Sequence, residues 1–87
     1  MQQDDVVIYW RPGCAYCLDL LLRLSWTRLR YRKINIRSDP DAKAFVRSVA
    51  NGNETVPTVV VAGRAMVNPS KRQLLAEVRA HAPQALS

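Results

Sequence analysis

Two cysteines, Cys14 and Cys17, are the residues best suited to chemistry, and they are the only cysteines in the chain. A run of strand-forming residues, Val6–Trp10, precedes them, and a leucine-rich stretch with helical spacing, residues 18–29, follows. The pair is therefore predicted at a turn from strand to helix, with Cys14 at the helix N-terminus. Unpaired N–H groups and the helix dipole favour a negative charge there, so we expect Cys14 to react as a thiolate. A second thiol one turn further along can attack a disulfide formed on the first.

The same C-x-x-C spacing also occurs in zinc sites and in structural disulfides. A zinc site usually needs a second pair of ligands, and this chain offers only His81, far away in sequence. A structural disulfide across so short a loop removes little entropy from the unfolded chain and so stabilises little. The spacing therefore favours a redox pair, Cys14 and Cys17, that can close as a disulfide, with no metal bound.

Length and composition predict one small globular domain. The chain has 87 residues, of which 48% are hydrophobic, enough for a folded core. We expect that core over about residues 5–81 of a single domain, 1–87, with a frayed C-terminal tail. No apolar run reaches the length of a membrane span, and the polar N-terminus has no signal-peptide pattern. We therefore predict a cytoplasmic monomer without a membrane partner, in a compartment where a cysteine pair is more often catalytic than structural.

The net charge of +6 comes from 13 lysines and arginines against 7 acidic residues. The dense basic cluster, residues 28–33, spans a predicted helix end and the start of the next strand. Cations are favoured at a helix C-terminus, so local structure accounts for the cluster. Nucleic-acid binding would call for a basic stripe with stacking aromatics. We therefore expect no nucleic-acid partner, and instead a mild preference for anionic thiols or acidic proteins.

The first half of the chain predicts two helices and a second strand. The helix after the cysteines should present an apolar face that is widened by Leu20 and Leu24. The main residues of that face are Leu18, Leu21, Leu22, Trp26 and Leu29. Residues 31–36 read as a strand parallel to the first. Asp39 and Pro40 mark the start of the next helix, which ends at residues 51–52.

The second half predicts a hairpin and a last helix. A β-branched strand over residues 58–62 turns through Gly63-Arg64 into a short strand over 65–67. Asn68-Pro69-Ser70 has the cap-then-proline pattern of a helix start. The order is βαβαββα, an α/β fold with a four-stranded mixed sheet and helices on both faces.

Thr55-Val56-Pro57 is the second informative motif. Proline has no N–H for a sheet ladder, so Pro57 belongs at the first residue of the following strand. Alone, the motif would suggest a trans proline that opens an edge strand. With a redox C-x-x-C pair upstream, we expect a cis Val56–Pro57 bond instead. Val56 would then present its N–H and C=O to an extended thiol substrate, in the manner of strand addition.

Over roughly residues 6–80 the chain resembles the glutaredoxin branch of the thioredoxin fold. The resemblance rests on Arg11, on the Cys14-Ala15-Tyr16-Cys17 site and on residues 51–57. It implies that the first cysteine is the nucleophile and the second the resolving residue. It also implies a substrate site made by Arg11, Tyr16 and Thr55-Val56-Pro57, with Arg11 assisting the thiolate or a substrate carboxylate.

The resemblance has one departure, in the turn after the hairpin. Many glutathione-dependent members carry a Gly-Gly-x-Thr-Asp-like turn there, which holds the two ends of glutathione. This chain has Val67-Asn68-Pro69-Ser70 instead, and with its C-x-Y-C site it is similar to the mycoredoxins. These use mycothiol, a sugar-based thiol without a γ-glutamyl group. The resemblance therefore implies mycothiol, rather than glutathione, as the co-substrate, and no tightly bound cofactor.

The predicted function is thiol–disulfide exchange on mixed disulfides between proteins and a small thiol. An NADPH-dependent flavoprotein reductase would act indirectly by regenerating the small thiol. Two alternatives stay open. A general protein-disulfide reductase served by a thioredoxin-type reductase would need Cys17 at every turnover. An iron–sulfur cluster carrier commonly has a single cysteine followed by a small residue, and Tyr16-Cys17 does not fit that pattern.

Overall fold

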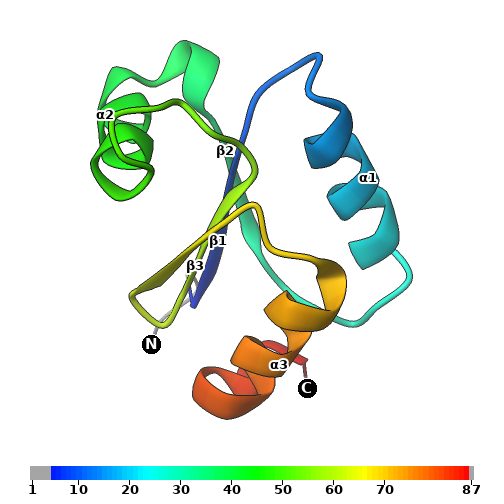
Figure 1. Cartoon of the computed structure of the whole chain (residues 1–87). Coiled ribbons are helices and arrows are strands. Elements are labelled where there is room, and N and C mark those ends of the chain that lie inside the picture. Colours follow the sequence, from blue (N-terminus) through cyan, green and yellow to red (C-terminus); the bar gives the residue numbers. More distant parts are fainter. Residues whose placement is uncertain (1–4, 87) are drawn as a thin grey trace.

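The computed structural model describes residues 5–86; the polar N-terminal residues 1–4, where a signal peptide was not expected, and Ser87 lie outside it. Four strands form one sheet: β1 (Val6–Trp10), β2 (Arg32–Asn35), β3 (Thr58–Val61) and β4 (Arg64–Val67). The helices are α1 (Ala15–Leu24), α2 (Pro40–Val49) and α3 (Lys71–His81), with two 3-10 turns, η1 (Ile36–Ser38) and η2 (Pro83–Leu86). The predicted order βαβαββα is confirmed (Figure 1). None of the helices in this part of the chain is long and apolar enough to cross a bilayer.

The sheet has the order β2-β1-β3-β4. It is mixed, as predicted. Strand β1 pairs in parallel with β2 and antiparallel with β3, and β3 and β4 form a hairpin. Because β1 lies between two neighbours and under helices, Val6, Val7 and Ile8 are all buried. Figure 1 shows α2 on one side of the sheet and α1 with α3 on the other. Residues 11–14 connect the carboxyl end of β1 to the start of α1.

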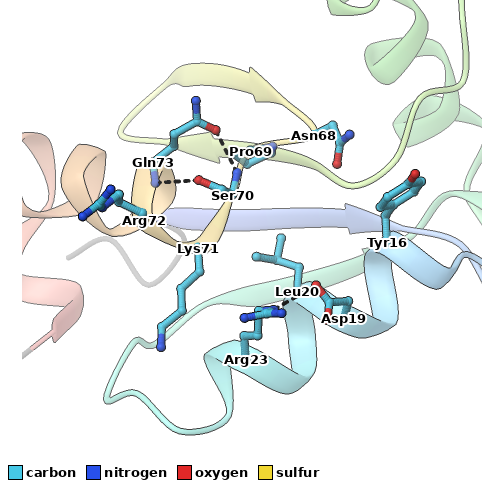
Figure 2. A pocket seen from close by; sticks show the side chains of 10 residues that line it. All are labelled: Tyr16, Asp19, Leu20, Arg23, Asn68, Pro69, Ser70, Lys71, Arg72 and Gln73. Atoms are coloured by element: carbon cyan, nitrogen blue, oxygen red, sulfur yellow. Dashed lines mark hydrogen bonds and ion pairs between the residues drawn. The ribbon is translucent and has the colours of Figure 1, made fainter.

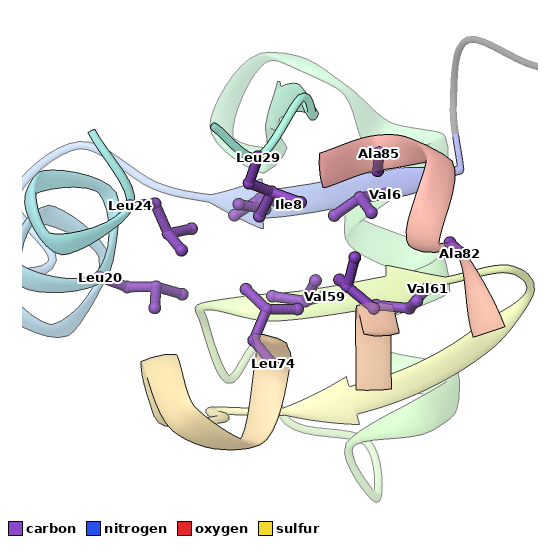
Figure 3. Close-up of a cluster of buried hydrophobic side chains, with 11 residues drawn as sticks. Val6, Ile8, Leu20, Leu24, Leu29, Val59, Val61, Leu74, Ala82 and Ala85 are labelled. Atoms are coloured by element: carbon purple, nitrogen blue, oxygen red, sulfur yellow. The ribbon is translucent and has the colours of Figure 1, made fainter. Parts of the chain in front are cut away.

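Two clusters of buried side chains hold the layers together. The larger packs α1 and α3 against β1 and β3, with Leu24, Ile8 and Leu74 near its centre (Figure 3). The smaller joins α2 to the end of the sheet and contains Val46, together with Cys17 from α1. A fully buried aliphatic side chain stabilises the fold by roughly 1.5–3 kcal/mol relative to an exposed one. Cys17, the predicted resolving cysteine, is thus also a core residue.

Helix α1 is shorter than predicted, and it buries a different face. It ends at Leu24, and the rest of the predicted helix, through Leu29, forms a connection to β2. Leu20 and Leu24 are buried. The other predicted face residues include three that are exposed by 57%, 63% and 82%: Leu18, Leu22 and Trp26. Their placement in the core was wrong, because α1 packs along the line of residues 17, 20 and 24.

The predicted start of α2 is confirmed, whereas the predicted start of α3 is corrected. The Asp39 side chain accepts a hydrogen bond from the Ala42 N–H at 3.0 Å, and Pro40 is the first helical residue of α2, as predicted. For α3, the cap is Ser70, which forms a capping box with Gln73. The predicted cap-then-proline pattern therefore does not apply to α3, since its proline precedes the cap.

The C-terminal tail is folded rather than frayed. Pro83–Leu86 forms η2, and Ala82 and Ala85 are buried in the larger core cluster. The Arg30 N–H donates a hydrogen bond to the Ala85 carbonyl at 2.8 Å. The predicted fraying was wrong over these residues because their small apolar side chains close the core beside the connection from α1 to β2.

Candidate functional site

Cys14 lies at the N-terminus of α1, as the sequence predicts. It is the N-cap residue, with extended backbone angles, and its sulfur accepts a hydrogen bond from the Cys17 N–H at 3.2 Å. The Cys14 N–H in turn donates to the Arg11 carbonyl at 3.3 Å. Gly13 has φ +84°, a conformation that is costly for residues with a side chain, so it permits this turn. The sulfur therefore takes the place of the usual capping oxygen at the N-terminus of α1.

The second motif packs directly against this sulfur. The Cys14 thiol donates a hydrogen bond to the Val56 carbonyl, with 3.5 Å between Sγ and O. The Val56–Pro57 peptide bond is cis, which confirms the prediction. The Thr58 hydroxyl donates to the Thr55 carbonyl at 2.8 Å and so ties this loop to the start of β3. Residues 42 positions apart in sequence thus meet at one point, the carboxyl end of β1.

The two cysteines occupy contrasting environments. Cys14 is half-buried, whereas Cys17 is fully buried, and both are free thiols in the structure. Burial, together with the neighbouring Cys14 side chain, raises the pKa of the Cys17 thiol to about 12. Cys17 is therefore a protonated thiol near neutral pH, which leaves Cys14 as the accessible sulfur.

This contrast predicts selective alkylation. With iodoacetamide at pH 7, we expect Cys14 to be modified at least ~100-fold faster than Cys17, because the thiolate reacts and a thiol of pKa about 12 is ionised in roughly one molecule in 10⁵. The Cys17 rate should rise about tenfold per pH unit as the pH increases towards its raised pKa. Peptide mapping by mass spectrometry measures both rates, and the protein in urea is the control in which both react. Equal rates in the folded protein would contradict the assignment.

Arg11 lies at the rim of the site, and it has a partner that the sequence did not predict. Its guanidinium Nη1 is 3.9 Å from Oε1 of Glu54, and Arg47 from the last turn of α2 hydrogen-bonds to the other carboxylate oxygen. The hydrogen bond from Arg47, with the charges of Arg47, Lys43 and Arg11, holds the pKa of Glu54 below its usual value. Glu54 directly precedes Thr55 of the second motif. This position beside the motif is the sequence signal from which a role for Glu54 at the site could have been predicted.

Tyr16 lines a different hollow from Arg11. The residue is 70% exposed and borders a groove of about 570 Å³ between α1 and the start of α3 (Figure 2). Asp19 in this groove forms an ion pair with Arg23 at 2.9 Å. The first turn of α3 has no acidic residue and contributes Lys71 and Arg72 instead. Tyr16, two residues after Cys14, thus lines one hollow, and Arg11, three residues before it, lines another.

The predicted site residues therefore fall into three groups. Cys14, Val56 and Pro57 meet at the centre, with Cys17 buried behind them. Arg11 and Thr55 line a shallow depression on one side, which also contains Arg47, residues 52–53 and Glu54. Tyr16 lines the other hollow. The arrangement supplies one accessible sulfur, one buried sulfur and an exposed rim on which a substrate can lie.

Comparison with known proteins agrees with this geometry. The family model described as Glutaredoxin matches residues 6–66. A protein of Mycobacterium tuberculosis that is named as a glutaredoxin is 39% identical over 74 residues, which cover 84% of this chain and 88% of the relative. Mycoredoxin 1 of Corynebacterium glutamicum is 35% identical over 78 residues, which cover 88% of this chain and 96% of the relative.

Solved structures show the same fold. A point mutant of a thioredoxin-like protein superposes with a TM-score of 0.74 at 19% identity, covering 86% of this chain and 95% of that one. A glutaredoxin of Populus tremula × tremuloides superposes with a TM-score of 0.63 at 19% identity, covering 95% and 82%. The predicted thioredoxin-like fold is thereby confirmed. Given the family-model match and the two sequence relatives, the chain belongs to the glutaredoxin family, whose members are generally thiol–disulfide oxidoreductases.

Proposed function

We propose that this glutaredoxin reduces mixed disulfides between proteins and a low-molecular-weight thiol, and that the small thiol is mycothiol. The observation that carries the proposal is the contact between Cys14 Sγ and the Val56 carbonyl at the N-terminus of α1. It puts a partly exposed sulfur beside backbone groups that can pair with an extended substrate.

The reaction consists of two thiol–disulfide exchanges. The Cys14 thiolate attacks the small thiol's sulfur, so a bond forms between Cys14 and the small thiol while the bond to the protein breaks. The protein sulfur leaves as a thiolate and takes a proton. A second molecule of small thiol then attacks the small-thiol sulfur bound to Cys14, which restores the Cys14 thiolate and releases the oxidised small thiol. The two electrons come from the small thiol, which an NADPH-dependent flavoprotein reductase would regenerate.

The groove beside Tyr16 supports mycothiol over glutathione. The γ-glutamyl end of glutathione carries an ammonium group, which would need an acidic partner near the start of α3. Asp19 is the one acidic side chain among the residues that line this groove, and Arg23 already pairs with it. Lys71 and Arg72 could pair with the α-carboxylate of that end but not with its ammonium. A sugar thiol carries hydroxyl groups and no such ammonium, so it leaves no buried cation without a partner in this groove. The similarity to Mycoredoxin 1 points the same way.

A side-by-side assay tests the choice of small thiol. One peptide disulfide is prepared with mycothiol and with glutathione, and each is assayed with its own thiol, its reductase and NADPH. We expect kcat/KM to be at least ~10-fold higher for the mycothiol form, a factor that corresponds to about 1.4 kcal/mol for the unpaired ammonium. Equal or faster turnover of the glutathione form would contradict mycothiol, and turnover only with a thioredoxin-type reductase would favour the direct protein-disulfide reductase.

The proposal includes the expected partners and compartment. The protein substrates are mixed-disulfide proteins, and the flavoprotein reductase meets the small thiol rather than this chain. A cytoplasmic location would suit this chemistry, because a reducing compartment keeps both cysteines available as thiols.

A further inference from the structure

The carboxylate of Glu54 lies between two arginines at the edge of the site. One oxygen is 3.9 Å from Arg11 and the other is hydrogen-bonded to Arg47. The three residues come from the turn before α1, the last turn of α2 and the loop before β3. Both arginine side chains are about half exposed, whereas the Glu54 side chain is 28% exposed. The pair of guanidinium groups thus forms a cationic subsite that the chain's own carboxylate occupies.

This subsite adjoins the reacting sulfur. The Arg11 carbonyl accepts the Cys14 N–H, and Glu54 is two residues before Val56, whose carbonyl contacts the Cys14 sulfur. Arg11 and Glu54 both line the depression on this side of the cysteine turn. A small thiol that pairs with Val56 can extend one end into this depression, because Glu54 and Thr55, the two residues before Val56, line it. The charge of that end is therefore presented to Arg11, Arg47 and Glu54.

Two guanidinium groups at such a place would attract a substrate carboxylate. With Glu54 between them, an incoming carboxylate has to displace Glu54 or accept repulsion from it. The depressed pKa of Glu54 keeps its negative charge throughout the neutral range. An uncharged group, such as an amide or a hydroxyl, meets no such competition and can still accept hydrogen bonds from the exposed N–H groups.

We infer that Glu54 is a specificity-determining residue, which fills the cationic subsite of Arg11 and Arg47 and so selects small thiols that are uncharged at that end over those that end in a carboxylate. The inference rests on the proposed function, because it assumes that Cys14 attacks a small-thiol disulfide bound along Val56. It extends that function by naming the charge of the substrate end that the site accepts and the residue that excludes the other class.

The test uses two probes that differ in one group. They are the 2-pyridyl disulfides of N-acetyl-cysteinyl-glycine, which ends in a carboxylate, and of its uncharged glycinamide. Cys14 attacks the cysteinyl sulfur, the new disulfide forms on Cys14, and 2-thiopyridone leaves and is followed by its absorbance. We expect Glu54→Gln to raise the second-order rate constant for the carboxylate probe roughly fivefold and to leave the amide probe within about twofold.

Two further variants isolate the cause. Glu77→Gln removes a carboxylate that pairs with Arg64 at 2.9 Å, on α3 and β4, and should leave the ratio of the two rates unchanged. Glu54→Gln combined with Arg47→Gln should return the ratio towards that of the wild type, because one of the freed cations is gone. A loss of folding would change both probes together, so the ratio reports the charge effect.

The outcomes separate this inference from the function on which it rests. If the wild type reacts with both probes but Glu54→Gln leaves their ratio unchanged, the inference is overturned and the proposed function stands. If the wild type reacts with neither probe, both are overturned. A rise confined to the carboxylate probe, reversed in the double variant, supports the role of Glu54.

Discussion

Cys14→Ser is expected to abolish turnover of mycothiol mixed disulfides, whereas Cys17→Ser is expected to retain substantial activity. A serine hydroxyl at position 14 cannot serve as the attacking thiolate, and Cys17 cannot replace it. Cys17 is fully buried and its raised pKa keeps it protonated, so it cannot meet an incoming disulfide.

The retained activity of Cys17→Ser is expected because only one of the two sulfur atoms is accessible to solvent. After the first exchange, the mixed disulfide lies on Cys14, which is partly exposed, and not on the fully buried Cys17. A second small thiol can arrive there from solution. Cys17 competes with it, because its attack on Cys14 diverts the enzyme into an internal disulfide that must be reduced before the next turnover. A direct protein-disulfide reductase has no outside resolver and depends on Cys17.

The measurement is steady-state turnover with mycothiol, its reductase and NADPH. Cys17→Ala is assayed beside Cys17→Ser, because a hydroxyl at a fully buried position costs stability that an apolar side chain avoids. Circular dichroism establishes that each variant is folded. Complete inactivity of both folded Cys17 variants would overturn the mixed-disulfide mechanism and favour the direct reductase.

The centre of the site could be predicted from sequence because its signals are local. The C-x-x-C pair follows a strand and opens a helix, and Pro57 directly precedes β3, the strand that pairs with β1, although it was predicted as that strand's first residue. Once β1 and β3 are neighbours, the two motifs must meet at one end of the sheet. The partner of Arg11 could not be predicted in this way. Glu54 and Arg47 meet only because the end of α2 packs beside the loop before β3, and no local pattern encodes that contact.

In the fold too, features that depend on local sequence were predicted, whereas features that depend on non-local packing were not. The start of α2 and the hairpin of β3 and β4 follow from local chemistry, namely the Asp39 cap and the turn at Gly63. The tail was mispredicted because its order depends on a non-local hydrogen bond, from Arg30 to Ala85. The buried face of α1 was mispredicted for another reason. Leucines surround so much of this helix that several rotations would each bury an apolar face, and only packing against β1 and α3 selects one.

That selection leads to the last prediction, which compares two leucines on α1. Leu24 is 1% exposed within the larger core cluster, whereas Leu22, two residues before it, is 63% exposed. Leu24→Ala should lower the free energy of unfolding by about 2–5 kcal/mol, because it removes buried methyl groups and leaves a cavity between α1, β1 and α3. Leu22→Ala should change it by about 0.5 kcal/mol or less, because the side chain already contacts water.

Urea denaturation of the two variants and the wild type, followed by circular dichroism, measures both free energies. The substitutions are chemically identical and lie on one helix, so helix propensity and side-chain size cancel between them. The difference between the variants therefore reports only which face of α1 is buried. Equal losses would mean that α1 does not pack as described, and a larger loss at Leu22 would restore the face that the leucine spacing first indicated. A large loss confined to Leu24 would also support the burial of Cys17, since Cys17 and Leu24 lie on the same face of α1.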